Sequence, residues 1–365
     1  MKVAIVCDWL TNVGGAEKVL LEIHRLYPKA PIYTSKYAPR KISWFADAEV
    51  RTGWLNVFPT CLRRVLGPLR LRWFSRLDLS EYDLVISVTG AEAKAVRVSK
   101  PGAKHISYCH VPTQYYWQMY DDYMKNPGFG AFNPVVRFFF KRLVGSQRKK
   151  DFEAAQRVDE FVTISEYAKE LIAKYYKREA TVIHPPVEIK DFAHKGNNRE
   201  NYYIVTSRQV NWKRLDLAVK ACLRFHRELL VVGEGPEHKR LVKMAENSEF
   251  VKFLPLQNRE GLASLLAGAK GYIFPSLEPF GIAPVEALAA GTPVIAFGEG
   301  GALDYINDGK NGVLFGKQTV SSLMEAVENF EKLKFDPKKV SKSASEFSVE
   351  RFDREIKEFV DEKTV

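Results

Sequence analysis

The stretch EPFGIAPVEAL, residues 278–288, places one carboxylate on each side of a loop-to-helix junction. The apolar run GYIFP (271–275) in front of it predicts a buried strand that ends there. Pro284 suits the first turn of a helix, because an N–H at that position would have no partner within the helix, and this predicts a helix over 285–290. A strand, a loop and a helix therefore follow one another directly.

The two carboxylates and the amides between them suit a sugar nucleotide. Glu278 is expected before the helix and Glu286 one turn inside it. The amides of Phe280, Gly281 and Ile282 can hold an anion, since the first N–H groups of a helix have no acceptor within it. Glu286 can accept two hydroxyl hydrogen bonds from a ribose. On spacing alone, a solvated pair of glutamates beside a helix cap explains the pattern equally well.

A second loop carries two cations. The segment SRQVNWKRLD (207–216) follows the apolar strand 202–206 and precedes an amphipathic run at 215–225. Arg208 and Lys213 flank this strand-to-helix loop, where they can neutralise a diphosphate without a metal ion. Singly, each would be interpreted as a solvated surface charge. The sequence contains no Asp-x-Asp triplet to clamp a divalent ion, so we expect a metal-independent protein with no cofactor.

Strand-length apolar segments alternate with helical segments along the whole chain, which is typical of parallel α/β sheets. A polar stretch at 190–201, with KGNN (195–198) as a turn, separates two sets of six strands. The two sets are Rossmann-like, and two domains are also the default for a chain of 365 residues. The predicted strands are 3–8, 31–34, 84–88, 105–108, 160–164 and 181–184, then 202–206, 228–232, 251–254, 271–274, 293–296 and 312–315.

Together with these two loops, VVGEGP (231–236) and NVGGAE (12–17) carry a resemblance that runs almost end to end. They are similar to retaining glycosyltransferases of family four, whose GT-B fold has two Rossmann-like domains facing a cleft. The resemblance implies an acceptor-binding domain at 1–187, a nucleotide-sugar-binding domain at 188–345, and a terminal helix at 346–365 that crosses back. The sequence itself shows only an amphipathic helix there, capped by Ser348.

The segment YCHVPTQYYW (108–117) resembles the mannosyltransferases that build lipid-linked bacterial polysaccharides such as O-antigen. Thr113 and Gln114 depart from the Arg-containing version of that pattern. The resemblance implies GDP-mannose as donor, and for His110 a contact with a sugar hydroxyl or a carbonyl that faces the anomeric centre. Taken alone, a histidine beside three aromatic residues is more often a hydrogen-bonded core residue.

Charge stabilisation at the leaving diphosphate is expected from Arg208, Lys213 and the amides near Gly14, Gly15 and Gly281. The Gly14-Gly15 pair alone fits a tight turn equally well, and the dinucleotide pattern Gly-x-Gly-x-x-Gly is absent.

By resemblance, Glu278 orients sugar hydroxyls, and Glu234 and Leu256 are weaker candidates for nucleotide contacts. No residue is a secure nucleophile. The family's favoured mechanism is a front-face displacement in which the leaving phosphate takes the acceptor proton.

The excess positive charge lies in the first half of the chain. Residues 1–180 hold 29 Lys or Arg and 18 Asp or Glu, whereas residues 181–365 hold 26 of each, so the first half carries the whole net charge of +11. The four cysteines lack metal-binding spacing and suggest reduced, cytosolic thiols. No signal peptide and no apolar run of spanning length is expected.

Two basic clusters lie within this half: Arg63 to Arg76, with Trp73 and Phe74, and Arg137 to Lys150, with the Phe138 to Phe140 run. Basic residues with aromatic anchors suit an anionic membrane surface and also nucleic acid. Helices whose cationic chains cover a core are the alternative.

We therefore expect a cytoplasmic enzyme on the inner face of the membrane. It would transfer a hexose, by resemblance mannose from GDP-mannose, to a polyprenyl-linked or saccharide acceptor, without binding nucleic acid. The first alternative is a GT-B nucleotide-sugar epimerase or hydrolase. The second, which the sequence supports less, is a basic nucleic-acid-binding protein.

Overall fold

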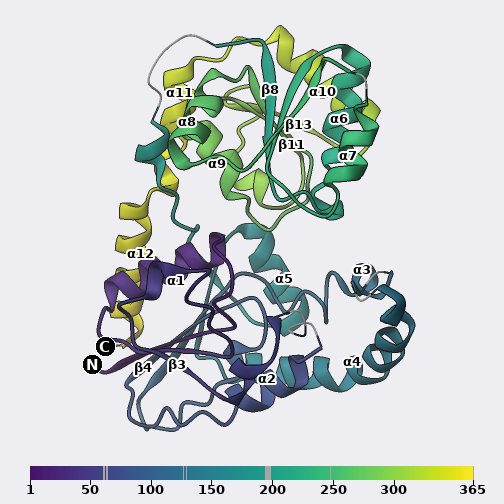
Figure 1. Cartoon of the computed structure of the whole chain (residues 1–365). Helices are drawn as coiled ribbons and strands as arrows, with labels where there is room; N and C mark the ends of the chain where they lie inside the picture. Colours follow the sequence, from purple (N-terminus) through teal and green to yellow (C-terminus); the bar gives the residue numbers. More distant parts are fainter. Residues whose placement is uncertain are drawn as a thin grey trace. The chain divides into compact units, whose positions relative to one another are not determined.

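The computed structural model describes residues 1–60, 62, 65–125, 127–128, 130–193, 199–246 and 248–364. The predicted turn at 195–198, and Arg63 and Arg64 of the first basic cluster, lie outside the described residues. The chain divides into two units (Figure 1). Unit 1 is Met1–Pro185 with Phe352–Val365, and unit 2 is Pro186–Arg351.

Unit 1 holds a seven-stranded sheet in the order β3-β2-β1-β4-β5-β6-β7, and all neighbouring strands run parallel. Its central strands are continuous apolar runs, as expected where both faces are covered. The strands are β1 (Val3–Cys7), β2 (Ile32–Thr34), β3 (Val50–Thr52), β4 (Leu84–Thr89), β5 (Lys104–Cys109), β6 (Glu160–Thr163) and β7 (Thr181–Val182).

The helices of unit 1 are α1 (Gly15–Leu26), α2 (Gly67–Phe74), α3 (Tyr120–Lys125), α4 (Asn133–Gln156), α5 (Glu166–Tyr176) and α12 (Val349–Thr364). Ser348 caps α12 by accepting the Arg351 amide at 3.3 Å, as predicted. Phe352 of α12 packs edge-on against Tyr108 of β5, with ring centroids 5.9 Å apart. Figure 1 shows α12 beside α1, and this packing raises the pKa of Tyr27 to about 12, through burial first and Asp361 second.

Unit 2 repeats this plan with six parallel strands in the order β10-β9-β8-β11-β12-β13. The strands are β8 (Tyr202–Thr206), β9 (Glu228–Val232), β10 (Val251–Leu254), β11 (Gly271–Phe274), β12 (Val294–Phe297) and β13 (Gly312–Phe315). The helices are α6 (Leu215–Phe225), α7 (His238–Met244), α8 (Arg259–Gly268), α9 (Ile282–Ala289), α10 (Val320–Lys332) and α11 (Pro337–Ser343).

Helices cover both faces of the unit 2 sheet. Figure 1 shows α6, α7 and α10 on one face and α8, α9 and α11 on the other. Helix α6 buries Leu215, Ala218, Val219 and Cys222, whose spacing of three and four residues forms one apolar stripe. This stripe packs with α10 against the sheet, so the core lies between the layers.

The prediction of two parallel-sheet, Rossmann-like domains is confirmed, and each of the twelve predicted strands is present. Strand β3 was not predicted. Its three residues lie at the edge of the sheet with Arg51 and Thr52 exposed, so no apolar pattern marks it.

Strand order reverses once in each sheet, between β1 and β4 in unit 1 and between β8 and β11 in unit 2. Loops after the two flanking strands leave the sheet in opposite directions, which opens a crevice at the carboxyl ends of the strands. Each unit therefore has one switch point where a ligand can bind.

Candidate functional site

Lys213 and Glu278 form an ion pair at the unit 2 switch point. Lys213 lies in the loop after β8 and Glu278 in the loop after β11, and Nζ of Lys213 contacts Oε2 of Glu278. Ser276 donates its hydroxyl to the other carboxylate oxygen at 2.7 Å. The side chains of Lys213 and Glu278 are 17% and 12% exposed. The Lys213 ammonium has three N–H donors and Glu278 engages one of them, so Lys213 can also donate a hydrogen bond to a ligand.

Trp212 adds an aromatic face to this pair. Its ring centroid lies 4.5 Å from the Lys213 ammonium, and the side chain is 46% exposed. A cation over an indole face is stabilised by the ring quadrupole. Trp212 was not predicted as a site residue; its position next to Lys213 in the sequence was the available signal.

The start of α9 completes the unit 2 site. Gly281 has φ +94°, and a Cβ there would lie 2.6 Å from the Phe274 ring, so the chain needs glycine at this turn. No side chain caps the helix. Gly281 and Ile282 line a small cavity of about 50 Å³ with Lys213 and Glu278. The cavity thus joins a cation, a carboxylate and the amide end of a helix.

Phe280 and Glu286 flank this cavity without lining it. The Phe280 side chain is buried against Tyr305 and Phe347, with ring centroids 5.5 and 5.8 Å away, and its carbonyl accepts the Tyr305 hydroxyl at 2.9 Å. Glu286 lies in α9 and is 9% exposed. Burial raises the pKa of the Tyr272 hydroxyl well above its usual value, and the charges of Glu278 and Glu286 add to this effect.

The other predicted unit 2 residues are more exposed. Arg208 is exposed, makes no ion pair with any residue in the described part of the chain, and does not line the cavity beside Lys213 and Glu278. Glu234 is exposed, and its backbone carbonyl accepts the Gln209 amide at 2.8 Å. Leu256 is 80% exposed after β10.

Gln209, which the sequence analysis missed, holds the β8 and β9 loops together. Its fully buried amide donates to the Gly233 carbonyl at 2.6 Å, and its oxygen lies 2.9 Å from Nδ1 of His238. A Cβ at Gly235 would lie 2.3 Å from the Gln209 carbonyl, so glycine is needed for this approach. A glutamine between two cations gave no sequence signal for this role.

The segment Gly300-Gly301 was also missed. It follows β12, and the Gly301 amide donates to the Glu278 carbonyl at 2.8 Å. A Cβ at Gly300 would lie 2.5 Å from that carbonyl, and one at Gly301 would lie 2.4 Å from the Phe280 Cα. The run GEGG (298–301) after a buried strand was the available signal.

The unit 1 switch point is occupied by the buried side chain of Asp8, directly after β1. It accepts hydrogen bonds from the Thr89 hydroxyl at 2.9 and 3.0 Å and from the amides of Gly90, Ala91 and Ala93 at 2.9, 3.0 and 2.7 Å. Burial nevertheless raises the pKa of Asp8, with the charge of Glu92 as the second cause. The carboxylate thereby fastens the loop after β4 to β1.

Gly14 and Gly15 lie at the start of α1, as predicted from their position after the first strand. Gly14 is the N-cap residue with an extended backbone, and no side chain caps the helix. A Cβ at Gly14 would lie 2.9 Å from the Glu17 carboxylate. The pair exposes helix amides, which suits an anion but does not identify one.

His110 follows β5 and is held by its backbone amide, which donates to the Thr89 carbonyl at 2.8 Å. Its ring lies edge-on to Tyr108 at 5.6 Å, and its buried Nε2 has no hydrogen-bond partner among the described residues. Burial lowers the pKa of His110 to about 4, so the imidazole is neutral at pH 7. His184 places Nδ1 3.0 Å from the Ile164 carbonyl.

A buried ion pair supports the segment that follows His110. Lys94 and Asp151 are each 1% exposed and lie 2.7 Å apart. Asp151 also accepts from Thr113 at 2.9 Å, Trp117 at 2.7 Å and Tyr176 at 2.8 Å. This network, absent from the sequence analysis, fixes residues 113–117.

The second buried pair corrects one sequence interpretation. Arg70, assigned to a membrane-facing cluster, is 3% exposed and donates to Glu92 at 2.9 Å and to the Tyr115 hydroxyl at 3.1 Å. Phe74, expected as an anchor, is fully buried. The assignment was wrong for both residues, because the apolar stripe of α2 turns them into the core; Arg72 and Arg76 remain exposed.

Within the described ranges, no group of His, Cys, Asp and Glu side chains could hold a metal ion, and no helix is long and apolar enough to cross a membrane. Cys7, Cys109 and Cys222 are buried free thiols, and Cys61 lies outside the described residues. Burial raises the pKa of Cys109 and of Cys222 to about 12, so both are protonated.

Comparison with known proteins finds a family model that matches most of unit 2. Residues 187–347 match the family model described as Glycosyl transferases group 1. The chain is 30% identical over 219 residues to the D-inositol 3-phosphate glycosyltransferase of Mycobacterium leprae. The aligned region covers 54% of this chain and 50% of that protein. The chain spans about half the length of the curated relatives it matches.

Solved structures share the fold over the full length. Anabaena Alr3699/HepE in complex with UDP superposes with a TM-score of 0.70 at 18% identity, covering 99% of this chain and all of that chain. The lipopolysaccharide outer core galactosyltransferase WaaB gives a TM-score of 0.71 at 14% identity, covering both chains completely. The fold is therefore GT-B.

Proposed function

We propose that this chain, whose unit 2 matches the group 1 glycosyl transferases, is a glycosyltransferase that moves a hexose from a nucleoside diphosphate sugar to an acceptor hydroxyl. The observation that carries the proposal is the ion pair of Lys213 and Glu278 at the unit 2 switch point, beside the start of α9. A cation and free helix amides suit a diphosphate, and a carboxylate suits sugar hydroxyls.

In this scheme Lys213 and the amides at Gly281 and Ile282 stabilise the negative charge that grows on the leaving diphosphate. Stabilising this charge lowers the free energy of the transition state. The electrostatic interaction is stronger in a site that is partly shielded from water. Arg208, exposed on the same loop, adds long-range attraction for the donor.

Glu278 orients the hexose, since Lys213 and Ser276 hold its carboxylate in place. Glu286 binds the ribose hydroxyls. Neutral His110 acts as a hydrogen-bonding group toward the sugar, with no proton to donate as an acid at pH 7. The anomeric configuration is retained, with the leaving phosphate taking the acceptor proton.

The donor we propose is GDP-mannose, on the resemblance carried by residues 108–117. UDP sugars are the direct competitor, because the Anabaena protein of the same fold was solved with UDP. A thermal-shift panel of GDP, UDP, ADP and their sugars tests both. A ligand at a hundred times its dissociation constant adds about 2.7 kcal/mol to stability. A panel without any shift would contradict the proposal.

The acceptor we propose is lipid-linked, and unit 1 meets it at an anionic membrane surface. Exposed cations on α4, on α2 and directly after α2 support this: Arg72, Arg76, Lys141, Arg142, Lys149 and Lys150. An epimerase or hydrolase on the same fold would consume the donor without an acceptor. Equal turnover with and without an acceptor would therefore favour that alternative.

A further inference from the structure

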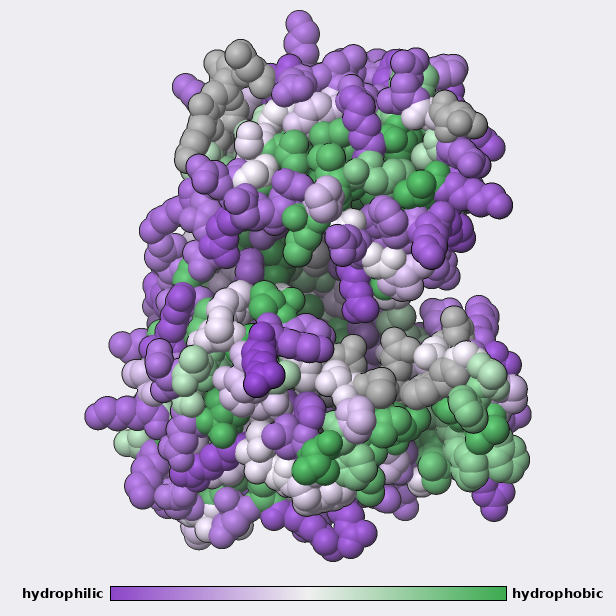
Figure 2. All heavy atoms as spheres, in the orientation of Figure 1, coloured by the Kyte–Doolittle hydropathy of each residue, from purple (hydrophilic) through white to green (hydrophobic). Residues whose placement is uncertain are grey.

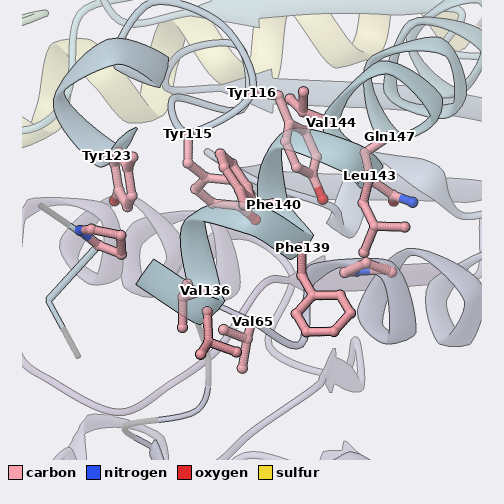
Figure 3. Close-up of a pocket in the computed structure, with 13 residues that line it drawn as sticks. Val65, Tyr115, Tyr116, Tyr123, Val136, Phe139, Phe140, Leu143, Val144 and Gln147 are labelled. Carbon is pink, nitrogen blue, oxygen red and sulfur yellow. The ribbon is translucent and has the colours of Figure 1, made fainter. Parts of the chain in front are cut away.

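An apolar groove runs along α4 in unit 1. It encloses about 290 Å³ between α4, the segment before α4, the start of α2 and the loop after β5. Figure 3 shows aromatic and aliphatic side chains turned toward this space. We call it the α4 groove; its lining includes Val65, Tyr115, Tyr123, Val136, Phe139 and Leu143.

Exposed apolar side chains continue from the groove onto the surface of α4. Phe132, Val135, Phe138, Phe139 and Leu143 are 71%, 55%, 64%, 56% and 44% exposed. Figure 2 shows hydrophobic atoms gathered over this part of unit 1. A contiguous apolar patch of this kind marks a binding surface, because water penalises its exposure.

The rim of the groove is cationic. Arg142 lies three residues after Phe139, and Lys150 lies seven after Leu143, so each shares a helix face with a groove residue. No acidic residue occurs from 126 to 150. Neither Arg142 nor Lys150 has an ion-pair partner in the described part of the chain. This rim is complementary to an anion.

The inner wall offers few polar groups. The hydroxyls of Tyr115 and Tyr116 are already engaged by Glu92. Gln147 lines the groove and is 4% exposed, and its Oε1 finds no donor among the described residues. A long apolar ligand would fill most of the space.

We propose that the α4 groove binds the hydrocarbon chain of an anionic lipid, with the lipid phosphate held by Arg142 and Lys150. This rests on the proposed function, because it identifies the groove as the site for the chain of the lipid-linked acceptor. A second copy of this protein fits the surface less well. A symmetric contact through α4 would bring the cations of two copies together with no acidic residues between them.

Two neighbouring phenylalanines provide a matched test. Phe139 lines the groove, whereas Phe138 does not, and both are more than half exposed on α4. Either can therefore be replaced by serine without opening the core. The probe is farnesyl phosphate below its aggregation concentration, titrated calorimetrically into the full chain, with farnesol and inorganic phosphate as separate arms.

Phe139→Ser should weaken farnesyl phosphate binding about tenfold or more, since it removes most of one apolar side-chain contact. Phe138→Ser should change it less than threefold. Leu143→Trp, which fills the groove, should weaken it as Phe139→Ser does. Farnesol should bind more weakly than farnesyl phosphate, and phosphate alone should not bind measurably.

Equal effects of Phe138→Ser and Phe139→Ser would overturn the proposal and indicate binding anywhere on the apolar surface of α4 rather than in the groove. No binding of farnesyl phosphate, with self-association through α4 in sedimentation, would assign the surface to a second copy. Nucleotide thermal shifts are measured on the same samples. Nucleotide binding without lipid binding would reject the groove assignment alone, and lipid binding without any nucleotide shift would reject the proposed function.

Discussion

The two sheets reverse strand order in the same way, yet their switch points differ. In unit 1 the crevice is closed by Asp8, which accepts one hydroxyl and three amide hydrogen bonds from the neighbouring loop. In unit 2 the crevice holds Lys213 and Glu278, which pair with each other and remain 17% and 12% exposed. One topology thus carries a structural carboxylate in one unit and an accessible ion pair in the other.

The two carboxylates are therefore expected to differ in how much they contribute to the stability of their units. A buried carboxylate with several donors is expensive to remove, because the donors lose their partner away from water. A partly exposed ion pair contributes little stability, since water and salt screen it. We therefore propose that the ligand binds at the unit 2 switch point, and the following substitutions test this.

The largest effect is expected for Asp8→Ala. Removing the carboxylate takes the acceptor from the Thr89 hydroxyl and from the amides of Gly90 and Ala93, whereas the Ala91 amide keeps Thr89 Oγ1 at 3.0 Å. Unit 1 should therefore lose on the order of 3 kcal/mol of stability or more. Hydrogen exchange of residues 89–95 should accelerate accordingly. The matched change, Glu278→Ala, should cost unit 2 no more than about 1 kcal/mol. Equal destabilisation by both would remove the distinction between the two switch points.

Lys213→Ala should lower turnover about a hundredfold, roughly 2.7 kcal/mol, because the leaving diphosphate loses its nearest cation. Lys239→Ala, an exposed lysine on α7, serves as the control and should leave turnover unchanged. Activity should survive EDTA. Full activity of the Lys213 variant, or a loss on chelation that manganese restores, would contradict the scheme.

Glu286→Ala should weaken donor binding by about 1.5 to 3 kcal/mol, or tenfold to a hundredfold, through two lost hydroxyl contacts. The affinity is measured by calorimetry with the preferred nucleotide, and circular dichroism checks the fold. A folded variant with unchanged affinity would remove Glu286 from the site.

Unit 1 should respond differently at its surface and in its core. Arg72→Gln with Arg76→Gln should loosen binding to anionic vesicles by about 2 kcal/mol, roughly thirtyfold, with nucleotide affinity unchanged. Arg70→Gln should instead destabilise unit 1, because it leaves Glu92 buried without its cation. Sedimentation with neutral and anionic vesicles distinguishes these outcomes; equal binding to both would remove the membrane role.

The smallest effect concerns pH. The folded pKa of His110, about 4, lies below the usual 6.5, so its neutral form stabilises the fold fully above pH 6.5. This contribution is lost as pH falls from 6.5 toward 4. Titration of His110 should therefore not shape the pH profile of kcat/KM between pH 5.5 and 7.5. The wild-type and His110→Asn profiles should have the same shape over this range. A limb near pH 6.5 that disappears in the variant would contradict a buried neutral imidazole.

The fold could be predicted from sequence because buried parallel strands are continuous apolar runs. Lys213 and Glu278 were predicted separately, since each follows such a strand. Their contact was not predictable, because it depends on β8 and β11 being neighbours. Asp8 and Arg70 escaped prediction for a related reason: their partners Ala93 and Glu92 lie 85 and 22 residues away. Charge patterns cannot show which cations a sheet buries.

We propose that the nucleotide binds at the accessible switch point of unit 2. This is best tested by a crystal structure with the nucleoside diphosphate that gives the largest thermal shift. We expect the diphosphate beside Lys213 and the start of α9, with the carboxylate of Glu286 on the ribose. A nucleotide bound instead at the ends of β1 and β4, with Asp8 displaced, would contradict it.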